Sequence, residues 1–279
     1  MSPLGRAAGS PEPPRPEGGS LTRARLSLAI AAAASLAAAT LAAAAPSAPP
    51  AGATAGPFSH AALDTVLTRF VHGERVDYGG LSRDRVALDR YLAAVATADP
   101  GPWGRAEQIA FWIDAYDAGV LAGVLRHPGL TSVMAVGKGT RGPDFFHERW
   151  RVAGRERSLD DIERGILRGR FREPRVHFVL NCASRSCPVL PPRAVTGAGL
   201  AARLEAATRA FLADTSRNRV EPGKGLWLSA IFDWYGDDFR AAAGSVPAFV
   251  ARHWTGPQRI APDLPIRFLP YDWSLNGTW

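Results

Sequence analysis

Hydrophobic residues recur at helical spacing through the first half of the chain beyond residue 57. A stripe of Phe58, Ala62, Val66 and Phe70 places apolar side chains on one face of a helix, with polar residues between them. Similar stripes follow, and two of them end at Pro-Gly pairs, which stop helices. The pattern therefore predicts three helices, over residues 58–71, 81–98 and 105–126.

The second half of the chain mixes short strand patterns with helical ones. Alternating residues around glycine-containing turns predict hairpins over residues 145–158 and 218–228. Ser158 and Asp161 are spaced like a capping box, which predicts that a helix begins there. The other elements that we expect are a short buried strand at 175–181, helices at 200–213, 229–239 and 246–254, and an extended segment at 265–270.

These elements predict an α+β fold. Helices and antiparallel hairpins alternate without the strand–helix–strand rhythm of parallel α/β proteins. We expect helices packed around a small, mostly antiparallel sheet. Because no internal repeat and no long linker follow residue 57, residues 58–279 should form a single domain.

The N-terminal residues have the pattern of a targeting segment. Arg23 and Arg25 precede an apolar, alanine-rich run over residues 26–45, which ends in small residues that suit a signal peptidase. The run also has about the length that spans a bilayer, roughly 20 residues. We therefore expect residues 1–45 to be a signal peptide or a signal anchor, followed by a Pro/Ala/Gly linker at 46–57.

Such a segment predicts an exported protein, periplasmic or secreted, in a compartment that permits disulfides. If residues 26–45 are not cleaved, they would tether the protein to the membrane. An envelope substrate or a protein partner is then expected, of a kind that the sequence does not name.

The basic residues of the chain bear on whether it binds nucleic acid. The formal net charge is +7, and only two of the 33 basic residues, Lys138 and Lys224, are lysines. The arginines are scattered singly, with no run that could follow a phosphate backbone. We therefore expect no nucleic-acid binding.

The candidate chemistry is concentrated in residues 173–190. Both cysteines of the chain, Cys182 and Cys187, lie there, with His177 just upstream. These residues are compatible with a nucleophile site, a structural disulfide or two inert thiols. A metal site would have at most three ligands here, of which strand alternation separates two, so neither a metal nor another cofactor is expected.

A nucleophilic cysteine requires a stabilised thiolate. On the predicted strand, His177 and Cys182 point to opposite faces, whereas Cys187 follows a turn and can reach either face. Cys187 is thus the preferred nucleophile and His177 its base, with Cys182 nearby. Groups that could orient the imidazole are Asp114, Asp117, Asn181 and Asp272. Such a site would suit thiol-dependent amide hydrolysis or acyl transfer in the cell envelope.

The disulfide remains the alternative. A turn across the four intervening residues can bring the two Cα atoms within about 7 Å. A loop this small contributes on the order of 2 kcal/mol. The protein would then be a non-catalytic binding or structural module whose loop is pinned by Cys182 and Cys187.

Asp114 and Asp117 lie three residues apart on one face of the predicted helix at 105–126. Burying carboxylates among aromatic residues without a partner would cost several kcal/mol. We therefore expect an arginine beside them, with Arg164 as the main candidate.

Five motifs resemble those of a known family. They are FWIDAYDA at 111–118, SLDDIERGILR at 158–168, PRVHFVLNCASRSCPVL at 174–190, LSAIFDWYGDDF at 228–239 and YDWSLN at 271–276. In order and spacing they resemble the domain of unknown function 547 family. The resemblance says little about activity, because the family is named for lacking an assigned function.

The chain departs from the family pattern at three positions. The family helix usually carries asparagines where this chain has Asp114 and Asp117, and a histidine where it has Arg164. If that histidine were the family's base, this chain could not use it. The resemblance then implies a site that relies on His177, or none.

Overall fold

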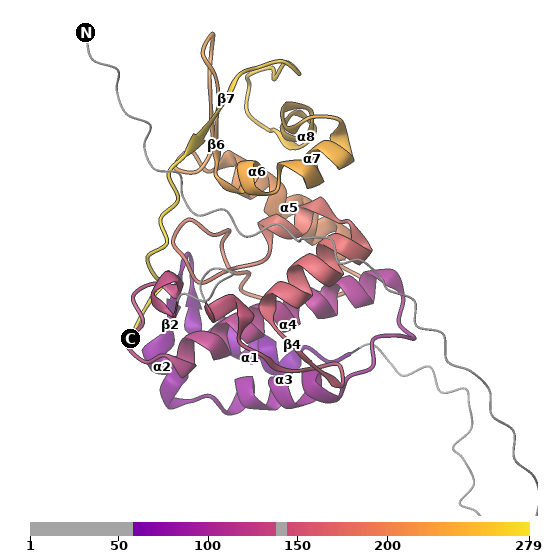
Figure 1. Cartoon of the computed structure of the whole chain (residues 1–279), viewed down its shortest axis with the longest axis vertical. Coiled ribbons are helices and arrows are strands. Elements are labelled where there is room, and N and C mark those ends of the chain that lie inside the picture. Colours follow the sequence, from indigo (N-terminus) through magenta and orange to yellow (C-terminus); the bar gives the residue numbers. More distant parts are fainter. Residues whose placement is uncertain (1–57, 138–143) are drawn as a thin grey trace, which may run out of the picture. The chain divides into compact units, whose positions relative to one another are not determined.

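Helix α4 (Arg105–Arg126) is the central element of the fold. The structure is a computed structural model that describes residues 58–137 and 144–279. Every residue of α4 from Gln108 to Leu125 is buried, not only the predicted stripe. The reason is that α2, α3, α5 and the helix η3 all pack against it (Figure 1).

The N-terminal elements cover one side of α4. They are α1 (Ala61–Phe70), β1 (Val71–His72), β2 (Arg75–Asp77), α2 (Tyr78–Arg83) and α3 (Val86–Thr97). The helix predicted at 81–98 is therefore two helices. Asp77 caps the first by accepting the backbone N–H of Gly80, and the chain leaves helical geometry at Asp84 before α3 begins.

The middle of the chain holds short elements and one longer helix. They are η1 (Val133–Ala135), η2 (Asp144–His147), β3 (Trp150–Val152), β4 (Arg155–Arg157) and η3 (Asp161–Phe171), which is a π-helix. The predicted hairpin is present over β3 and β4. The predicted capping pair is confirmed, because Ser158 N donates to Asp161 Oδ2 and Asp161 N donates to Ser158 Oγ.

The strand predicted at 175–181 is wrong. Residues Pro174–Phe178 form a 3-10 helix, η4, and the chain continues as a loop. Glu173 begins the helix by accepting the backbone N–H of Arg175, and proline suits its first position. The alternation argument that separated His177 from Cys182 therefore does not apply.

The C-terminal part contains α5 (Leu200–Ala213), β5 (Arg219–Glu221), β6 (Gly225–Ser229), α6 (Ile231–Trp234), α7 (Gly236–Ala243), α8 (Val246–His253), β7 (Ile266–Leu269) and β8 (Gly277–Thr278). The predicted hairpin at 218–228 is present as β5 and β6. The sheets are β1-β2-β8, β3-β4 and β5-β6-β7. The fold is α+β as predicted, although β6 pairs with β7 and β2 with β8 in parallel.

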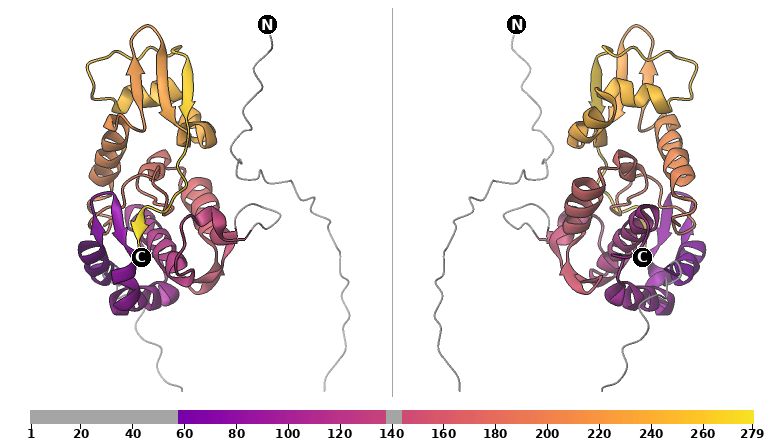
Figure 2. Two further views of the ribbon diagram at one scale, coloured as in Figure 1. Left: turned by 90° about the vertical axis from the view of Figure 1, so that its left-hand side faces the viewer. Right: turned by 90° about the vertical axis from the view of Figure 1, so that its right-hand side faces the viewer.

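Two hydrophobic clusters form the interior. The first surrounds α4, and the second joins Phe178 and Phe211 to β6 and α6–α8. The chain after β7 returns from the second cluster to the first, where β8 pairs with β2. Figure 2 shows this yellow segment running from β7 to the indigo strands. All described residues belong to one compact unit.

The predicted signal segment and linker lie outside the described residues. Among the helices that the structure describes, none has the length and apolar character needed to cross a membrane.

Candidate functional site

Cys182 and Cys187 form a disulfide, with their Cα atoms 6.2 Å apart. Neither cysteine is a free thiol in this structure. Cys187 is only 3% exposed, whereas Cys182 is half-buried. The two cysteines of the bond therefore differ in their exposure to solvent.

Hydrogen-bond donors surround the sulfur atoms. The backbone N–H of Cys182 donates to Cys187 Sγ at 3.0 Å, and the Tyr271 hydroxyl donates to the same sulfur at 3.2 Å. Ser184 Oγ lies 3.0 Å from Cys182 Sγ, 3.1 Å from Cys187 Sγ and 3.2 Å from the Tyr271 oxygen. We call Cys182, Ser184, Cys187 and Tyr271 the sulfur cluster. Burial raises the pKa of Tyr271, so its phenol stays protonated and can donate.

Asn181 holds the loop that carries both cysteines. Its Oδ1 accepts the backbone N–H of Ala183 at 2.9 Å, and its Nδ2 donates to the carbonyl of Pro188 at 2.8 Å. Asn276 Nδ2 also donates to Asn181 Oδ1. The loop is therefore fixed on both sides of the disulfide by side chains that do not depend on it.

The C-terminal segment adds a second support. The backbone N–H of Arg185 donates to the carbonyl of Ser274, and the backbone N–H of Asp272 donates to Ser186 Oγ. The Asp272 carboxylate, a predicted partner of an imidazole, is exposed. Hydrogen bonds from the side chain and the backbone N–H of Ser274 lower its pKa instead. The structure thus places Asp272 beside the cysteine loop but not beside His177.

Asp114 and Asp117 are buried, and both bind backbone N–H groups. Asp117 Oδ1 accepts the N–H of Asn181 at 2.9 Å, and the two oxygens of Asp114 accept the N–H of Val195 at 3.0 and 3.1 Å. Burial raises the pKa of Asp114 and raises that of Asp117 well above its usual value. The half-buried Asp64 accepts the backbone N–H of Ala194. Asp64, Asp114 and Asp117, the anchor carboxylates, thus hold both ends of the segment 181–195.

The expected arginine partner of these aspartates is wrong. Arg164 pairs with Asp160, at 2.6 Å between Nε and Oδ1. The side chain that contacts Asp114 is instead His60, whose Nδ1 lies 2.6 Å from Oδ2. His60 is 6% exposed and carried no signal in the sequence, because it stands alone and far from α4 along the chain.

His177, the predicted base, is bound elsewhere. Its Nε2 lies 2.8 Å from Asp238 Oδ2, and its ring stacks on Tyr235 with centroids 3.8 Å apart. Arg168 Nε donates to the same Asp238 oxygen at 2.6 Å. Burial alone would raise the pKa of Asp238, but hydrogen bonds from His177 and Arg168 lower it to about 2. No hydrogen bond among the described residues joins His177 to Cys182 or Cys187.

Glu163 is a polar group that the sequence analysis did not single out, although it lies in a family motif. The Tyr116 hydroxyl donates to Glu163 Oε2 at 3.4 Å. Burial, followed by the charge of Glu163, raises the pKa of Tyr116 and of Tyr235 well above the ordinary value. Burial also raises the pKa of Tyr271, and the charge of Glu163 adds to that rise.

An aromatic group adjoins the sulfur cluster. The rings of Trp234 and Trp273 stack with centroids 5.5 Å apart, and Tyr271 lies 4.8 and 4.6 Å from them. All three residues are half-buried. Contacts link the five motifs in turn. Tyr116 binds Glu163, and Asp117 binds Asn181. His177 binds Asp238, and Trp234 packs against Tyr271.

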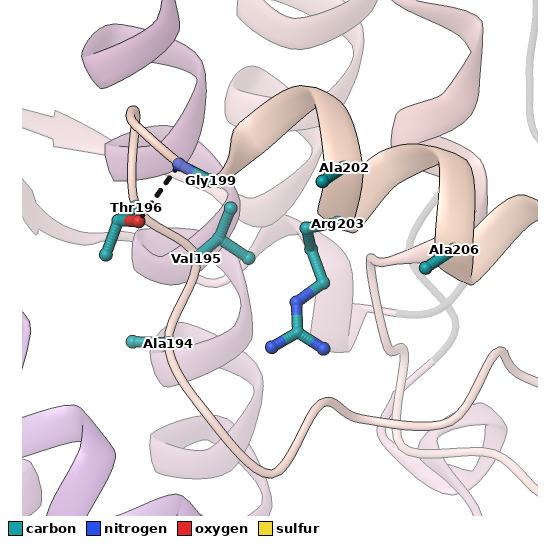
Figure 3. Close-up of a pocket in the computed structure, with 7 residues that line it drawn as sticks. All are labelled: Ala194, Val195, Thr196, Gly199, Ala202, Arg203 and Ala206. Atoms are coloured by element: carbon teal, nitrogen blue, oxygen red, sulfur yellow. Dashed lines mark hydrogen bonds between the residues drawn. The ribbon is translucent and has the colours of Figure 1, made fainter.

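A shallow cavity lies on another part of the surface. It has a volume of about 300 Å³ and is formed by the end of the segment 181–195 and the first turns of α5 (Figure 3). Its lining residues are Ala194, Val195, Thr196, Gly199, Ala202, Arg203 and Ala206. None of the residues predicted to carry chemistry lines it. In residues 58–137 and 144–279, no group of three His, Cys, Asp or Glu side chains is arranged to hold a metal ion.

Comparison with known proteins identifies a family. Residues 100–212 match the model of the family described as "Protein of unknown function, DUF547". The match contains the cysteine loop and Glu163, while the motifs at 228–239 and 271–276 lie beyond it. No curated protein and no solved structure matches the chain. Residues 100–212 of this chain are therefore similar to the DUF547 family.

Proposed function

We propose that the Cys182–Cys187 disulfide is a redox centre, which is reduced and reformed by exchange with a dithiol. The observation that carries this proposal is the set of donors on Cys187 Sγ, namely the backbone N–H of Cys182 and the hydroxyl of Tyr271. A disulfide sulfur is a weak hydrogen-bond acceptor, whereas a thiolate is a strong one. These donors therefore stabilise the reduced form more than the oxidised form, which makes a disulfide easier to reduce.

The support of the loop by other residues favours the same conclusion. Asn181 and Asn276 hold the loop on both sides of the sulfurs, and Asp117 holds the backbone N–H of Asn181. The disulfide itself closes a short loop and contributes only on the order of 2 kcal/mol. Its reduction should leave the loop in place, so that the bond can reform without refolding.

Export is part of the proposal. The basic and apolar pattern of residues 23–45 supports transfer across the membrane, followed by cleavage or retention as an anchor. In the exported compartment a disulfide persists unless a dedicated dithiol reduces it. The proposed partner is therefore a protein or small-molecule dithiol of the envelope.

The test is a redox titration of the full chain. The protein is equilibrated in buffers of oxidised and reduced dithiothreitol, quenched in acid, and its free thiols are counted. We expect a midpoint above about −300 mV, the value below which structural disulfides lie. Tyr271→Phe should lower the midpoint, because the reduced form loses a donor. The control is Tyr91→Phe, which removes a buried hydroxyl that contacts His60 and leaves the sulfurs untouched.

A midpoint in the structural range that Tyr271→Phe does not change would reject the redox centre. The chain would then be better described as a non-catalytic binding or structural module whose loop is pinned by the disulfide.

The same donors favour a second function, thiol-dependent amide hydrolysis or acyl transfer by the reduced protein. Donors that stabilise the Cys187 thiolate lower the pKa of its thiol, which creates a nucleophile at neutral pH. Alkylation of the reduced protein by iodoacetamide across pH tests this function. A midpoint well below about 8.5 would support an activated thiol. A higher midpoint in His177→Ala than in the wild type would show that the imidazole takes part, in spite of its bond to Asp238.

A further inference from the structure

We propose that exchange at this disulfide is one-sided: an incoming thiolate attacks Cys182 Sγ, and Cys187 Sγ is the leaving group. The inference rests on the proposed redox function and specifies which sulfur forms the covalent bond with the partner. The two cysteines differ in two independent respects. One is exposure to solvent, and the other is the set of hydrogen-bond donors on each sulfur.

Access favours attack at Cys182. Cys187 is 3% exposed, whereas Cys182 is half-buried, so Cys182 is the residue of the pair that solvent contacts more. A thiolate must approach the sulfur that it attacks from the side opposite the bond that breaks, so a buried sulfur is a poor target. Asn181 and Asp117 hold the backbone before Cys182, which keeps this difference in access in place.

The donors favour departure of Cys187. The backbone N–H of Cys182 donates to Cys187 Sγ and cannot reach its own sulfur in the same way. The Tyr271 hydroxyl is nearer to Cys187 Sγ, at 3.2 Å, than to Cys182 Sγ, at 3.4 Å. Ser184 Oγ in turn donates to the Tyr271 oxygen, which strengthens Tyr271 as a donor. A better stabilised thiolate leaves faster.

Reduction of the disulfide by a dithiol takes two steps. The thiolate of a dithiol forms a bond with Cys182 Sγ, the bond between the two protein sulfurs breaks, and its electron pair goes to Cys187 Sγ. The second thiol of the reductant, deprotonated, then attacks its own sulfur in the mixed disulfide. Cys182 leaves as a thiolate and takes up a proton. The reductant becomes an internal disulfide, and the protein gains two electrons.

The test locates the mixed disulfide in the wild-type full chain. Oxidised protein is exposed briefly to glutathione, which lacks a second thiol, and is then quenched in acid. The freed cysteine is alkylated, and mass spectrometry of peptides cut at Arg185, between the cysteines, assigns the adduct. We expect glutathione on Cys182 and the alkyl group on Cys187, in at least about tenfold excess over the reverse.

Single-cysteine variants provide an independent measurement. Cys187→Ser keeps the accessible thiol and should form a mixed disulfide with oxidised glutathione at least about tenfold faster than Cys182→Ser. Tyr271→Phe should slow the first step in the otherwise wild-type protein about tenfold, as expected for one lost hydrogen bond to a charged group. Tyr91→Phe is the matched control and should leave the rate unchanged.

The outcomes separate this inference from the proposed function. An adduct mainly on Cys187, or equal amounts on both, would overturn the one-sided exchange even if the disulfide proved to be reducible. A midpoint in the structural range together with an adduct on Cys182 would reject the redox function while supporting the order of attack.

Discussion

At the scale of single residues, buried side chains fix backbone that belongs to no helix or strand. Buried backbone N–H groups are almost always paired, because an unpaired one costs about 1–3 kcal/mol. Asp114 and Asp117 serve the N–H groups of Val195 and Asn181. In the second hydrophobic cluster, Asn218 Oδ1 accepts the N–H of Ser229, and its Nδ2 donates to the carbonyl of Phe211.

Asp238 leads to a prediction about acid stability. Its pKa in the folded protein is about 2, below the ordinary 3.8, because His177 and Arg168 hold its ionised form. A lowered folded pKa means that the unfolded chain binds the proton first. The stabilisation is therefore fully present above about pH 4 and is lost as the pH falls toward 2. Asp238→Asn should reduce the free energy of unfolding at pH 7 by on the order of 2 kcal/mol.

Urea unfolding at pH 7 and at pH 3 measures this effect. The difference between wild type and Asp238→Asn should shrink at pH 3. The matched control is Asp237→Asn in the same helix, because the Asp237 side chain is 92% exposed and forms a surface ion pair with Arg240. That change should stay within about 0.5 kcal/mol. A loss at Asp238 that does not depend on pH would contradict the electrostatic account.

Part of this residue-scale picture could be predicted from the sequence. Residue types and local spacing predict that Cys182 and Cys187 can meet. They also predict that Asp114 and Asp117 are buried with partners. Their partners do not, since His60 and Asn181 approach α4 only through the tertiary fold. The position of His177 is not predictable for a similar reason. Its imidazole binds Asp238, which lies 61 residues away along the chain.

At the scale of elements, α4 shows how tight packing around one helix limits its sequence. Gly119 faces the ring of Trp150, and a Cβ atom added there would overlap the indole. Gly165 in η3 faces open space. Alanine at Gly119 therefore tests the effect of packing on stability, and alanine at Gly165 tests the effect of helix propensity.

We predict opposite effects of alanine at these two glycines. Gly119→Ala should lower the free energy of unfolding by about 1–3 kcal/mol, because overpacking outweighs the better helix propensity. Gly165→Ala should raise it by about 0.5–1 kcal/mol. Thermal and urea unfolding of the two variants measure both. Stabilisation by Gly119→Ala would show that Trp150 moves aside without cost.

The elements themselves were predictable where local signals agree. The bounds of α4 match the predicted 105–126, since its apolar run is long and a Pro-Gly pair follows it. The short apolar run at 175–181 is ambiguous between strand and helix. Local capping decides between them, because Glu173 and Pro174 begin a 3-10 helix. Among the described residues, no sheet includes this segment.

At the scale of the whole molecule, the part matched by the family model depends on residues outside it. Residues 100–212 contain α4 and the cysteine loop. However, α3 packs on α4, His60 pairs with Asp114, and Asn276 and Tyr271 contact the loop. The interior around α4 is thus completed from both sides of the matched segment.

We therefore predict that residues 100–212 alone do not fold cooperatively, whereas residues 58–279 do. Without α1, α3 and the C-terminal segment, the apolar faces of α4 are open to water, and Asp114 lacks its contact with His60. Far-UV circular dichroism and tryptophan fluorescence in urea should show a gradual change for the short fragment and one coincident transition for the long one. A sharp transition of residues 100–212 would contradict this dependence.

The return of the chain after β7 has a consequence for the order in which the site is assembled. Cys182 and Cys187 are five residues apart, so they can meet as soon as both have left the ribosome or the translocation channel. Tyr271 follows Cys182 by 89 residues. During synthesis there is thus a period in which the bond can close while its sulfurs lack their hydroxyl donor. A nascent chain halted before residue 271 should hold its disulfide more firmly than the finished protein does.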